Sequence, residues 1–400
     1  NRYYTETTNK YSLEMIKLIG QPKVEESNSL TVATNLDGST SVTSSRAVYE
    51  YTSGKEKLGE LPENIVNRQN YINPATGLAY VGLLKGAVDG PIKDKFDING
   101  DGDTDDSGEK NPPGTLTLER DIYGNETESL TQTDYIIIND QAKADLAKTV
   151  SYGSNLDGLL TYTIREVDYS YAENGQLSAV KNLAVGQGSV KLNGTTVSYI
   201  GNDNEVVSIG VDTFGNYYVS KVENHYINPH EWKGKILVDW ALTKTDTTNL
   251  DGSKSQTLNY VHYNYNPENG LLDEHNPVDN IDPRTGERCN LSATVIVVGE
   301  EYSHKVDTKK DWNVNSVTVG GDLFGNWYWS ESLNQYTLIN GEPKPDSVMT
   351  ATNTCDAVGS TSKTIEGCEE VLKYSYDDKG RLTGITNTQD SIVLNDDGFG

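Results

Sequence analysis

The chain has 400 residues, of which 35% are hydrophobic, and its formal net charge is −26. This acidic balance argues strongly against nucleic-acid binding, which needs clustered Lys and Arg to displace counterions. No apolar run is long enough for a membrane helix. The 25 Tyr and 37 Gly, beside only 2 Met, favour half-buried pleated sheets joined by tight turns. We therefore expect an all-β, extracellular protein, secreted or on a cell surface, whose charge keeps it soluble and suits divalent cations.

A turn motif, Asp-x-aromatic-Gly-Asn, recurs along the chain. Complete copies begin at Asp121, Asp212 and Asp322. A partial copy, Asp397-Gly-Phe-Gly400, is completed by Asn1-Arg-Tyr-Tyr if the end of the chain is joined to its beginning. We expect the Gly to supply the bend and the aromatic ring to pack beneath it. The two termini therefore resemble halves of one repeat, which predicts that the sequence is a window from a periodic array.

Two further landmarks recur at fixed spacing. A Tyr that opens a short apolar run lies 14 residues after each motif Asp, at Tyr135, Tyr226 and Tyr336, with Tyr11 as the equivalent in the first unit. An Asn-Leu-Asp-Gly turn precedes a Tyr-x-Tyr pair, and 12 residues separate the Asp from the first Tyr in the pairs Asp37 and Tyr49, Asp157 and Tyr169, and Asp251 and Tyr263. A period of two places both rings on one face of a strand. In the fourth copy 18 residues separate Asp356 from Tyr374, because extra residues fall between Cys355 and Cys368.

These landmarks divide the chain into four β units. The units are 1–120, whose leading strand is supplied by a segment of the 397–400 type, then 121–211, 212–321 and 322–396, and 397–400 starts the next unit. Lengths vary after Tyr-x-Tyr, as loops do in repeat arrays. We interpret each unit as a small antiparallel β-sandwich-like domain in an elongated tandem array. Strands and turns are expected throughout, with no helix, and 142–148 is expected to be a strand.

The sharpest candidate site is in the insertion of the first unit, where six carboxylates lie between Asp97 and Glu109. The run Asp-Ile-Asn-Gly-Asp-Gly-Asp-Thr-Asp-Asp resembles the calcium loop of EF-hand and dockerin proteins, in which alternate oxygens wrap the ion around a Gly bend. The expected ligands are Asp97, Asn99, Asp101, Asp103 through its carbonyl, Asp105 and Glu109, the last one residue late for this pattern. A solvated acidic turn is the alternative, although such carboxylates repel one another without a cation. We predict that calcium orders this insertion; a second acidic loop, 279–287, lacks the spacing.

The cysteine spacing predicts one disulfide, and the histidines form no catalytic pattern. Cys355 and Cys368 flank a stretch rich in Gly, Ser and Thr, and we expect a disulfide across that hairpin. Cys289 is left over, either free or bridged to a neighbour. The five His form no ligand pattern, and no Gly-x-Ser-x-Gly, His-Glu-x-x-His or phosphate-binding loop is present. We therefore expect no enzyme and assign no catalytic residue.

One segment resembles a known family. Residues 374–386, Tyr-Ser-Tyr-Asp-Asp-Lys-Gly-Arg-Leu-Thr-Gly-Ile-Thr, are similar to a YD repeat of the RHS-type family of large secreted bacterial proteins. The likeness is weaker at 169–180, where Ala172 replaces the Asp and Gln176 the Arg. The resemblance implies a β-rich extracellular scaffold of tandem hairpins. The wide spacing of the hairpins favours a row of small domains over a closed shell, as in very long tandem-repeat bacterial surface or filament proteins.

We expect a structural role: a fibre, tape or stalk of a biofilm matrix or cell surface, stiffened by calcium and associating with copies of the same chain or repeat. An adhesin or glycan-binding protein is the first alternative, with the insertions 67–120 and 271–305, or the aromatic run 327–329, contacting the ligand. A segment of a secreted RHS-type toxin carrier or carbohydrate-active enzyme is the second. An exposed aromatic cluster on an insertion favours the first alternative, and a catalytic domain elsewhere in the protein favours the second.

Overall fold

The fold is described from a computed structural model. The structure describes residues 2–35, 37–92, 95–98, 100–104, 106, 109–229, 235–273, 276–306, 314–378 and 380–397. The chain divides into two compact units, residues 1–206 with 228–236 and residues 207–227 with 237–400. We call these the first and the second unit, and we refer to the four units of the sequence pattern as repeats. Most described residues lie in antiparallel strands, which confirms the all-β class. Among the described residues, no helix has the length and apolar character needed to span a membrane.

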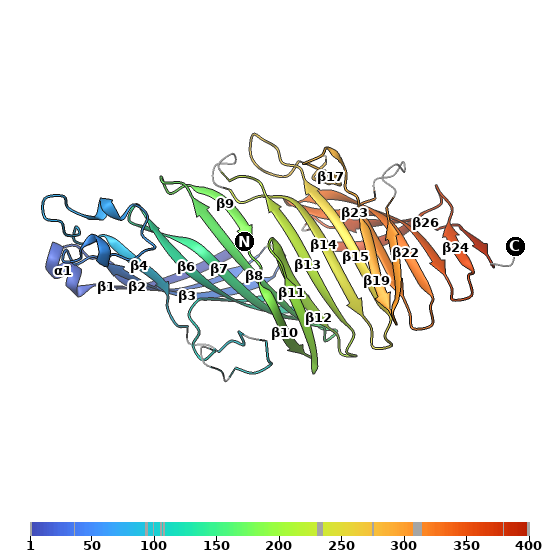
Figure 1. The fold of residues 1–400 in the computed structure, drawn as a ribbon, viewed down its shortest axis with the longest axis horizontal. Coiled ribbons are helices and arrows are strands. Elements are labelled where there is room, and N and C mark those ends of the chain that lie inside the picture. The colour runs from blue at the N-terminus through green and yellow to red at the C-terminus, as the bar shows by residue number, and fades with distance from the viewer. Residues whose placement is uncertain are drawn as a thin grey trace. The chain divides into compact units, whose positions relative to one another are not determined.

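The first unit is built on an antiparallel sheet whose strands follow one another along the chain (Figure 1). The strands are β1 (Arg2–Tyr11), β2 (Val24–Thr34), β3 (Thr40–Tyr51), β4 (Leu84–Asp89), β5 (Thr115–Arg120), β6 (Glu126–Ile138), β7 (Gln141–Ser154), β8 (Leu160–Tyr171) and β9 (Leu177–Asn182). A hairpin of β10 (Gly186–Leu192) and β11 (Thr195–Gly201) and the 3-10 helices η1 (Leu58–Glu60) and η2 (Arg68–Tyr71) complete it. Because β7 spans 142–148, the strand expected there is confirmed.

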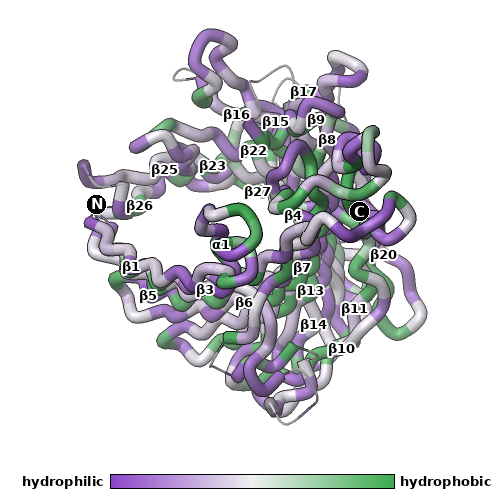
Figure 2. Tube along the Cα trace, turned by 90° about the vertical axis from the view of Figure 1, so that its left-hand side faces the viewer, coloured by the Kyte–Doolittle hydropathy of each residue, from purple (hydrophilic) through white to green (hydrophobic). Residues whose placement is uncertain are grey.

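A short helix, α1 (Leu13–Ile19), contradicts the expectation of strands and turns alone. It connects β1 to β2 and carries both hydrophobic and hydrophilic residues (Figure 2). The Ser12 hydroxyl accepts the Met15 N–H at 3.4 Å, and Gly20 ends the helix with a φ of +68°. These are ordinary start and stop signals of a helix. The sequence pattern does not indicate this helix because seven residues are fewer than the window in which a helical period can be recognised.

The second unit repeats the plan of the first. Its strands are β12 (Glu205–Val211, of which 207–211 belong to this unit), β13 (Tyr217–Tyr226), β14 (Val238–Thr248), β15 (Lys254–Tyr263), β16 (Val278–Asp279), β21 (Ser316–Gly321), β22 (Trp327–Ile339), β23 (Glu342–Cys355), β24 (Thr361–Thr364), β25 (Glu370–Tyr376), β26 (Leu382–Gln389) and β27 (Val393–Asp396). Two hairpins lie within its insertion: β17 (Ile281–Asp282) with β18 (Glu287–Arg288), and β19 (Ser292–Val297) with β20 (Glu300–Lys305).

One pairing rule recurs in both units. The strand that carries the Tyr-x-Tyr pair at its end is shared by two short strands. The insertion is the chain that follows Tyr-x-Tyr, both before the first short strand and between the two: 52–83 and 90–114 in the first unit, and 266–277 and 280–315 in the second. In the first unit, β5 pairs with residues 40–45 of β3 and β4 pairs with residues 47–51. In the second, β21 pairs with residues 254–259 of β15 and β16 with residues 262–263. The insertions can therefore vary in length while the sheet continues beside them.

The insertions also supply the layer that buries the sheet. In the first unit, Leu61, Ile65 and Tyr71 of the insertion pack with Ile137 of β6 in one core cluster. In the second, the β19–β20 hairpin packs Ala293 and Val295 against Trp240 and the valines of β21. Hydrophobic and hydrophilic residues are mixed along the strands and form no long apolar run (Figure 2). Burial is thus concentrated where an insertion covers a sheet face.

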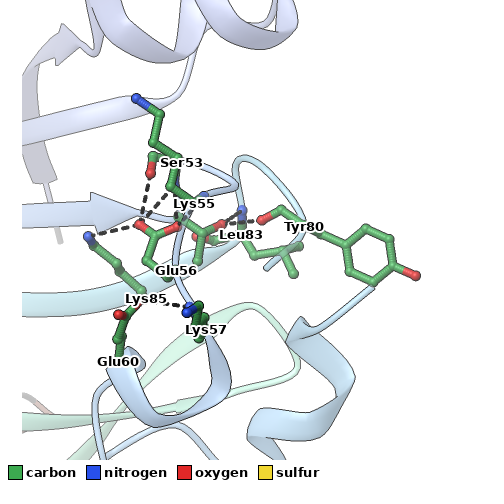
Figure 3. A network of polar contacts seen from close by, with 9 residues as sticks. Ser53, Lys55, Glu56, Lys57, Glu60, Tyr80, Leu83 and Lys85 are labelled. Carbon is green, nitrogen blue, oxygen red and sulfur yellow. Dashed lines mark hydrogen bonds and ion pairs between the residues drawn. The ribbon is translucent and has the colours of Figure 1, made fainter. Parts of the chain in front are cut away.

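Glu56 organises the start of the first insertion (Figure 3). Its carboxylate accepts the Ser53 N–H at 3.0 Å and the Lys55 N–H at 3.1 Å, and Lys85 Nζ lies 3.5 Å away. Partial burial opposes ionisation, but the hydrogen bonds from Ser53 and Lys55 outweigh it and lower the pKa of Glu56 to about 2. The carboxylate therefore holds the turn in its ionised form.

Acid should weaken this turn. Because the folded pKa lies below the ordinary value of 4.5, the stabilisation is complete above that value and is lost as the pH falls towards 2. Glu56→Gln should remove this pH dependence and cost about 1–2 kcal/mol of local stability at neutral pH. Hydrogen exchange of residues 52–57 between neutral and acidic pH measures both effects. Glu60→Gln, in the neighbouring η1 turn, is the matched control; equal pH dependence in all three proteins would contradict this assignment.

Candidate functional site

Each complete Asp-x-aromatic-Gly-Asn motif folds into the same turn. In the copy at Asp322, Oδ1 accepts the Phe324 N–H at 2.8 Å and the Asn326 N–H at 2.9 Å, and Oδ2 accepts the Asn326 side-chain N–H at 2.7 Å. Gly325 has a φ of +86°, which favours glycine. The copies at Asp121 and Asp212 make the same three bonds. The hydrogen bond from the Asn326 side chain is the main cause of a lowered pKa at Asp322.

The aromatic residue of the motif does not pack beneath the turn, so that expectation is wrong. Phe214 is 75% exposed, Phe324 is 80% exposed, and Tyr123 is also exposed. The Asp and Asn side chains close the turn by hydrogen bonds, so the turn holds its shape without a ring packed beneath it. The rings therefore line the surface of the turns.

Neighbouring turns contact each other through the motif Asn. Asn216 Oδ1 accepts the Leu250 N–H at 2.7 Å, and Asn326 Oδ1 accepts the Ala357 N–H at 3.2 Å. In the first unit, Leu156 packs against the backbone at Gly124. The motif turn thus bonds to or packs on the Asp-Gly turn of the next strand pair. The contacting turns are 121–125 with 155–158 in the first unit, and 212–216 with 249–252 and 322–326 with 356–359 in the second.

The two tyrosine landmarks meet at one bulge in every copy. The second Tyr of each Tyr-x-Tyr pair donates its hydroxyl to a backbone carbonyl: Tyr51 to Val24 at 2.8 Å, Tyr171 to Ala144 at 2.8 Å, Tyr265 to Val238 at 2.9 Å, and Tyr376 to Pro345 at 2.8 Å. Each acceptor residue is also the cross-strand partner of the Tyr that lies 14 residues after the motif Asp. The register shifts beside that pair. The fixed spacings therefore position a hydroxyl over a bulge.

Sequence reasoning missed the residue that forms the bulge. The unpaired extra residue is acidic in all four copies: Glu25, Asp145, Asp239 and Asp346. Burial raises the pKa of Asp145 and of Asp239. In the first copy Lys10 lies 3.5 Å from Glu25, and in the third His262 lies 3.7 Å from Asp239. An acidic residue one position after each acceptor carbonyl was the signal in the sequence.

The acidic insertion of the first unit is closed by Glu109. This side chain is only 2% exposed; its Oε1 accepts the Ile98 N–H at 3.1 Å and its Oε2 accepts the Asp106 N–H at 3.2 Å. Asp97 accepts the N–H groups of Gly100 at 2.6 Å and Gly102 at 3.0 Å. The two carboxylates therefore hold the loop by bonding its backbone.

The loop is attached to the rest of the unit at two points. The Gly100 carbonyl accepts the Lys191 N–H of β10 at 2.8 Å. Buried Phe96 packs against Tyr152 with ring centroids 5.6 Å apart, and Tyr152 in turn packs on Tyr162. Burial, followed by the charge of Asp97, raises the pKa of Tyr152. The Lys191 hydrogen bond and the packing of Phe96 on Tyr152 therefore anchor the loop to the unit.

The described residues include only some of the predicted calcium ligands. Asp101 Oδ1 accepts the Asp103 N–H at 3.1 Å, while Asn99 and Asp105 lie outside the described residues. Within the described ranges, no group of three or more His, Cys, Asp and Glu side chains is arranged to hold a metal ion. The hard oxygen donors present are those that calcium prefers. The calcium site stays a prediction.

The other candidate groups have partners within the protein. In the 279–287 loop, Asp279 bonds His262 at 2.9 Å and Asp282 bonds Arg284 at 2.7 Å. Trp327 and Trp329 stack with centroids 4.8 Å apart and pack against the core of the second unit. Trp327 and Trp329 therefore have a packing role, and Asp279 and Asp282 have hydrogen-bonding partners within the protein.

The three cysteines are free thiols in the structure. Cys355 ends β23 and Cys368 lies in the turn before β25, both half-buried. Their disulfide stays a prediction. Cys289 packs at the border of the second unit's core, where burial raises the pKa of its thiol to about 11. It is thus a protonated packing residue at neutral pH.

Comparison with known proteins adds no relative: no family model matches the chain, and no curated protein matches it significantly.

Proposed function

We propose that the protein is a structural scaffold: an extracellular fibre, tape or stalk of a biofilm matrix or cell surface, built from tandem β repeats. The observation that carries this proposal is the recurrence of one tyrosine-to-bulge hydrogen bond in all four copies. The repeated residues fix backbone geometry: the second Tyr of each pair bonds a backbone carbonyl, and each motif Asp bonds backbone N–H groups. A periodic sequence whose repeated residues make structural contacts fits a protein that acts as an extended scaffold.

The finer architecture is part of the proposal. The sequence alone suggests a row of small sandwiches, in which each unit folds around its own core. The described pairings within each compact unit favour repeats that share a sheet, because the short strands before each motif pair with strands on both sides. We favour an elongated array of four sheet repeats, each covered by its own insertion. Tandem hairpins of this kind are also what the YD-type resemblance implies.

Calcium is proposed to stiffen the first insertion. Asp97, Asp101, Asp103 and Glu109, with Asn99 and Asp105, would supply the oxygens. Glu109 and Asp97 already order the backbone around the loop. Binding would lower the repulsion among six nearby carboxylates. The stabilisation would act locally, on 90–115.

An adhesin or glycan-binding protein is the alternative function, with 67–120 and 271–305 as the ligand-binding insertions. The observation that favours it is that the longest additions, those of the first and third repeats, leave the sheet beside the short strands β4 and β16. A glycan array probed with the whole chain distinguishes the two functions. A toxin-carrier or carbohydrate-active segment is the third, and the described residues give it no specific support.

Small-angle X-ray scattering of the dilute, monodisperse chain tests the scaffold proposal. We expect the scattering of an elongated particle, and calcium should raise the melting temperature without changing that shape. A compact, globular profile would contradict the array. Specific glycan binding at low micromolar concentration or tighter would replace the scaffold by the adhesin. Loss of the calcium effect alone would remove only the metal from the proposal.

A further inference from the structure

The strands β1 and β27 are among those that present exposed edges; β26, which precedes β27, is another. Among the described residues, β1 pairs with β2 and β27 pairs with β24, each along one side only. All ten residues of β1 are exposed, with Tyr3 at 80%, and Leu394 of β27 is 66% exposed. β1 contains no Pro, and long exposed edges without Pro are templates for further pairing.

The outward backbone groups of the two edges are in phase. In an antiparallel ladder, hydrogen-bonded pairs alternate with non-hydrogen-bonded pairs. Asn35 N donates to Ser39 O at 2.9 Å, so the backbone N–H and C=O groups of odd positions in β2 point towards β3. Those of even positions point towards β1. In β1, the backbone groups of Tyr3 and Thr5 therefore point away from β2, towards the open edge. Ile365 N donates to Ile392 O at 2.8 Å, so even positions of β27 face β24, and Val393 and Asn395 face outward.

The internal repeats provide the register for joining these edges. Asp322 N donates to Asn326 O at 2.9 Å, and the next hydrogen-bonded pair is therefore Gly320 with Tyr328. If Asn1 of a second copy takes the place of the motif Asn after Asp397, the pair equivalent to Gly320 and Tyr328 is Asn395 and Tyr3. These are the residues whose backbone groups face outward on the two edges.

Charge agrees with this register. At the position nearest the motif turn, the first internal copy pairs Arg120 with Glu126, whose side chains lie 3.8 Å apart. The equivalent residues at the two edges are Asp396 and Arg2, an opposite-charge pair with the signs exchanged. The apolar positions agree as well: Leu394 corresponds to Val319, which is fully buried in its own sheet. Pairing would bring Leu394 opposite Tyr4.

We propose that β27 of one copy pairs antiparallel with β1 of a second copy of this sequence, in the register Asp396 with Arg2 and Leu394 with Tyr4. This rests on the proposed scaffold function and names the contact by which the scaffold grows. The contact joins two different edges, so it is head to tail and does not close on itself as a twofold interface would. Each added copy presents a new edge, and the sheet extends.

Disulfide trapping with the whole chain tests the register. Cys289, Cys355 and Cys368 are first replaced by Ser, and Tyr4→Cys and Leu394→Cys are then placed in separate chains and mixed. These residues form a non-hydrogen-bonded pair in the proposed register, with Cα atoms about 4.5 Å apart, within the range of a disulfide. We expect a covalent dimer from the mixture and a ladder of multimers when both changes are in one chain.

The matched control shifts one side chain to the opposite sheet face. Tyr3→Cys mixed with Leu394→Cys should trap at least roughly tenfold less dimer, because successive side chains alternate between faces. Asn395→Pro, at an outward position where Pro is tolerated, should keep the circular dichroism and melting temperature while lowering trapping roughly tenfold. Equal yields in and out of register, a cross-linked monomer, or no dimer would overturn the proposal. An elongated scattering profile of the single chain would still stand in that case, so the scaffold proposal is tested separately.

Discussion

Glu109→Ala should loosen the acidic insertion by about 2–4 kcal/mol, the largest effect we expect from one substitution. The Glu109 carboxylate is buried and bonds the backbone N–H groups of Ile98 and Asp106, which lie on opposite arms of the loop. Truncation leaves both donors without this acceptor and removes the bridge between the arms. The Phe96 N–H also bonds the Glu109 carbonyl at 3.1 Å, so that part of the loop remains tied to its neighbour.

Hydrogen exchange of residues 91–113 measures this loss without calcium. Asp101→Asn is the matched control, because the amide oxygen still accepts the Asp103 N–H and local stability should change by less than about 0.5 kcal/mol. The two variants diverge once calcium is added: Asp101→Asn should keep its loop but lose most of the calcium-induced rise in melting temperature. Unchanged protection in Glu109→Ala would show that the carboxylate does not hold the loop. An undiminished calcium effect in Asp101→Asn would remove that residue from the ligands.

The turns were predictable because they are local. A Gly at positive φ and an Asp whose side chain bonds the next few backbone N–H groups specify a turn within five residues. All three complete motifs fold alike for this reason. The strand at 142–148 could be predicted because the segment aligns with the strand-like residues 237–241 of the third repeat. The helix α1 was equally local, yet its seven residues were too few to show a helical period against the strand order of the other repeats.

The bulge and the shared strands could not be predicted in the same way. The hydroxyl of Tyr171 reaches a carbonyl 27 residues earlier, across strands whose register is set by the whole hairpin. Sequence spacing showed that these tyrosines recur but not that they converge. Likewise, nothing local indicates that β4 and β5 divide β3 between them, because that depends on where the insertion leaves the sheet. The exposed Phe324 ring shows the limit of a local argument about burial, since exposure depends on which faces the insertions cover.

Tyr171→Phe and Tyr265→Phe should each destabilise their own unit by about 1–3 kcal/mol, because each leaves a bulge carbonyl without its hydroxyl donor. The bulge cannot recover the bond from its ladder, since the register has already shifted there. Burial is the main cause that raises the pKa of Tyr265 to about 12. Since the folded pKa exceeds the ordinary value of 10, this stabilisation is complete below that value and is lost as the pH rises towards 12.

Denaturant unfolding of the two variants distinguishes a repeated structural bond from an incidental one. Tyr169→Phe and Tyr263→Phe are the controls, because they remove the hydroxyl of the first Tyr of each pair, which is not the one that reaches the bulge. We expect the loss in the second-Tyr variants alone, and the loss in Tyr265→Phe should disappear above about pH 12, where the native hydroxyl is ionised and no longer donates. Equal losses in all four variants would show that the rings stabilise the sheet by packing, and the four-fold recurrence of the bulge bond would then no longer support the scaffold function.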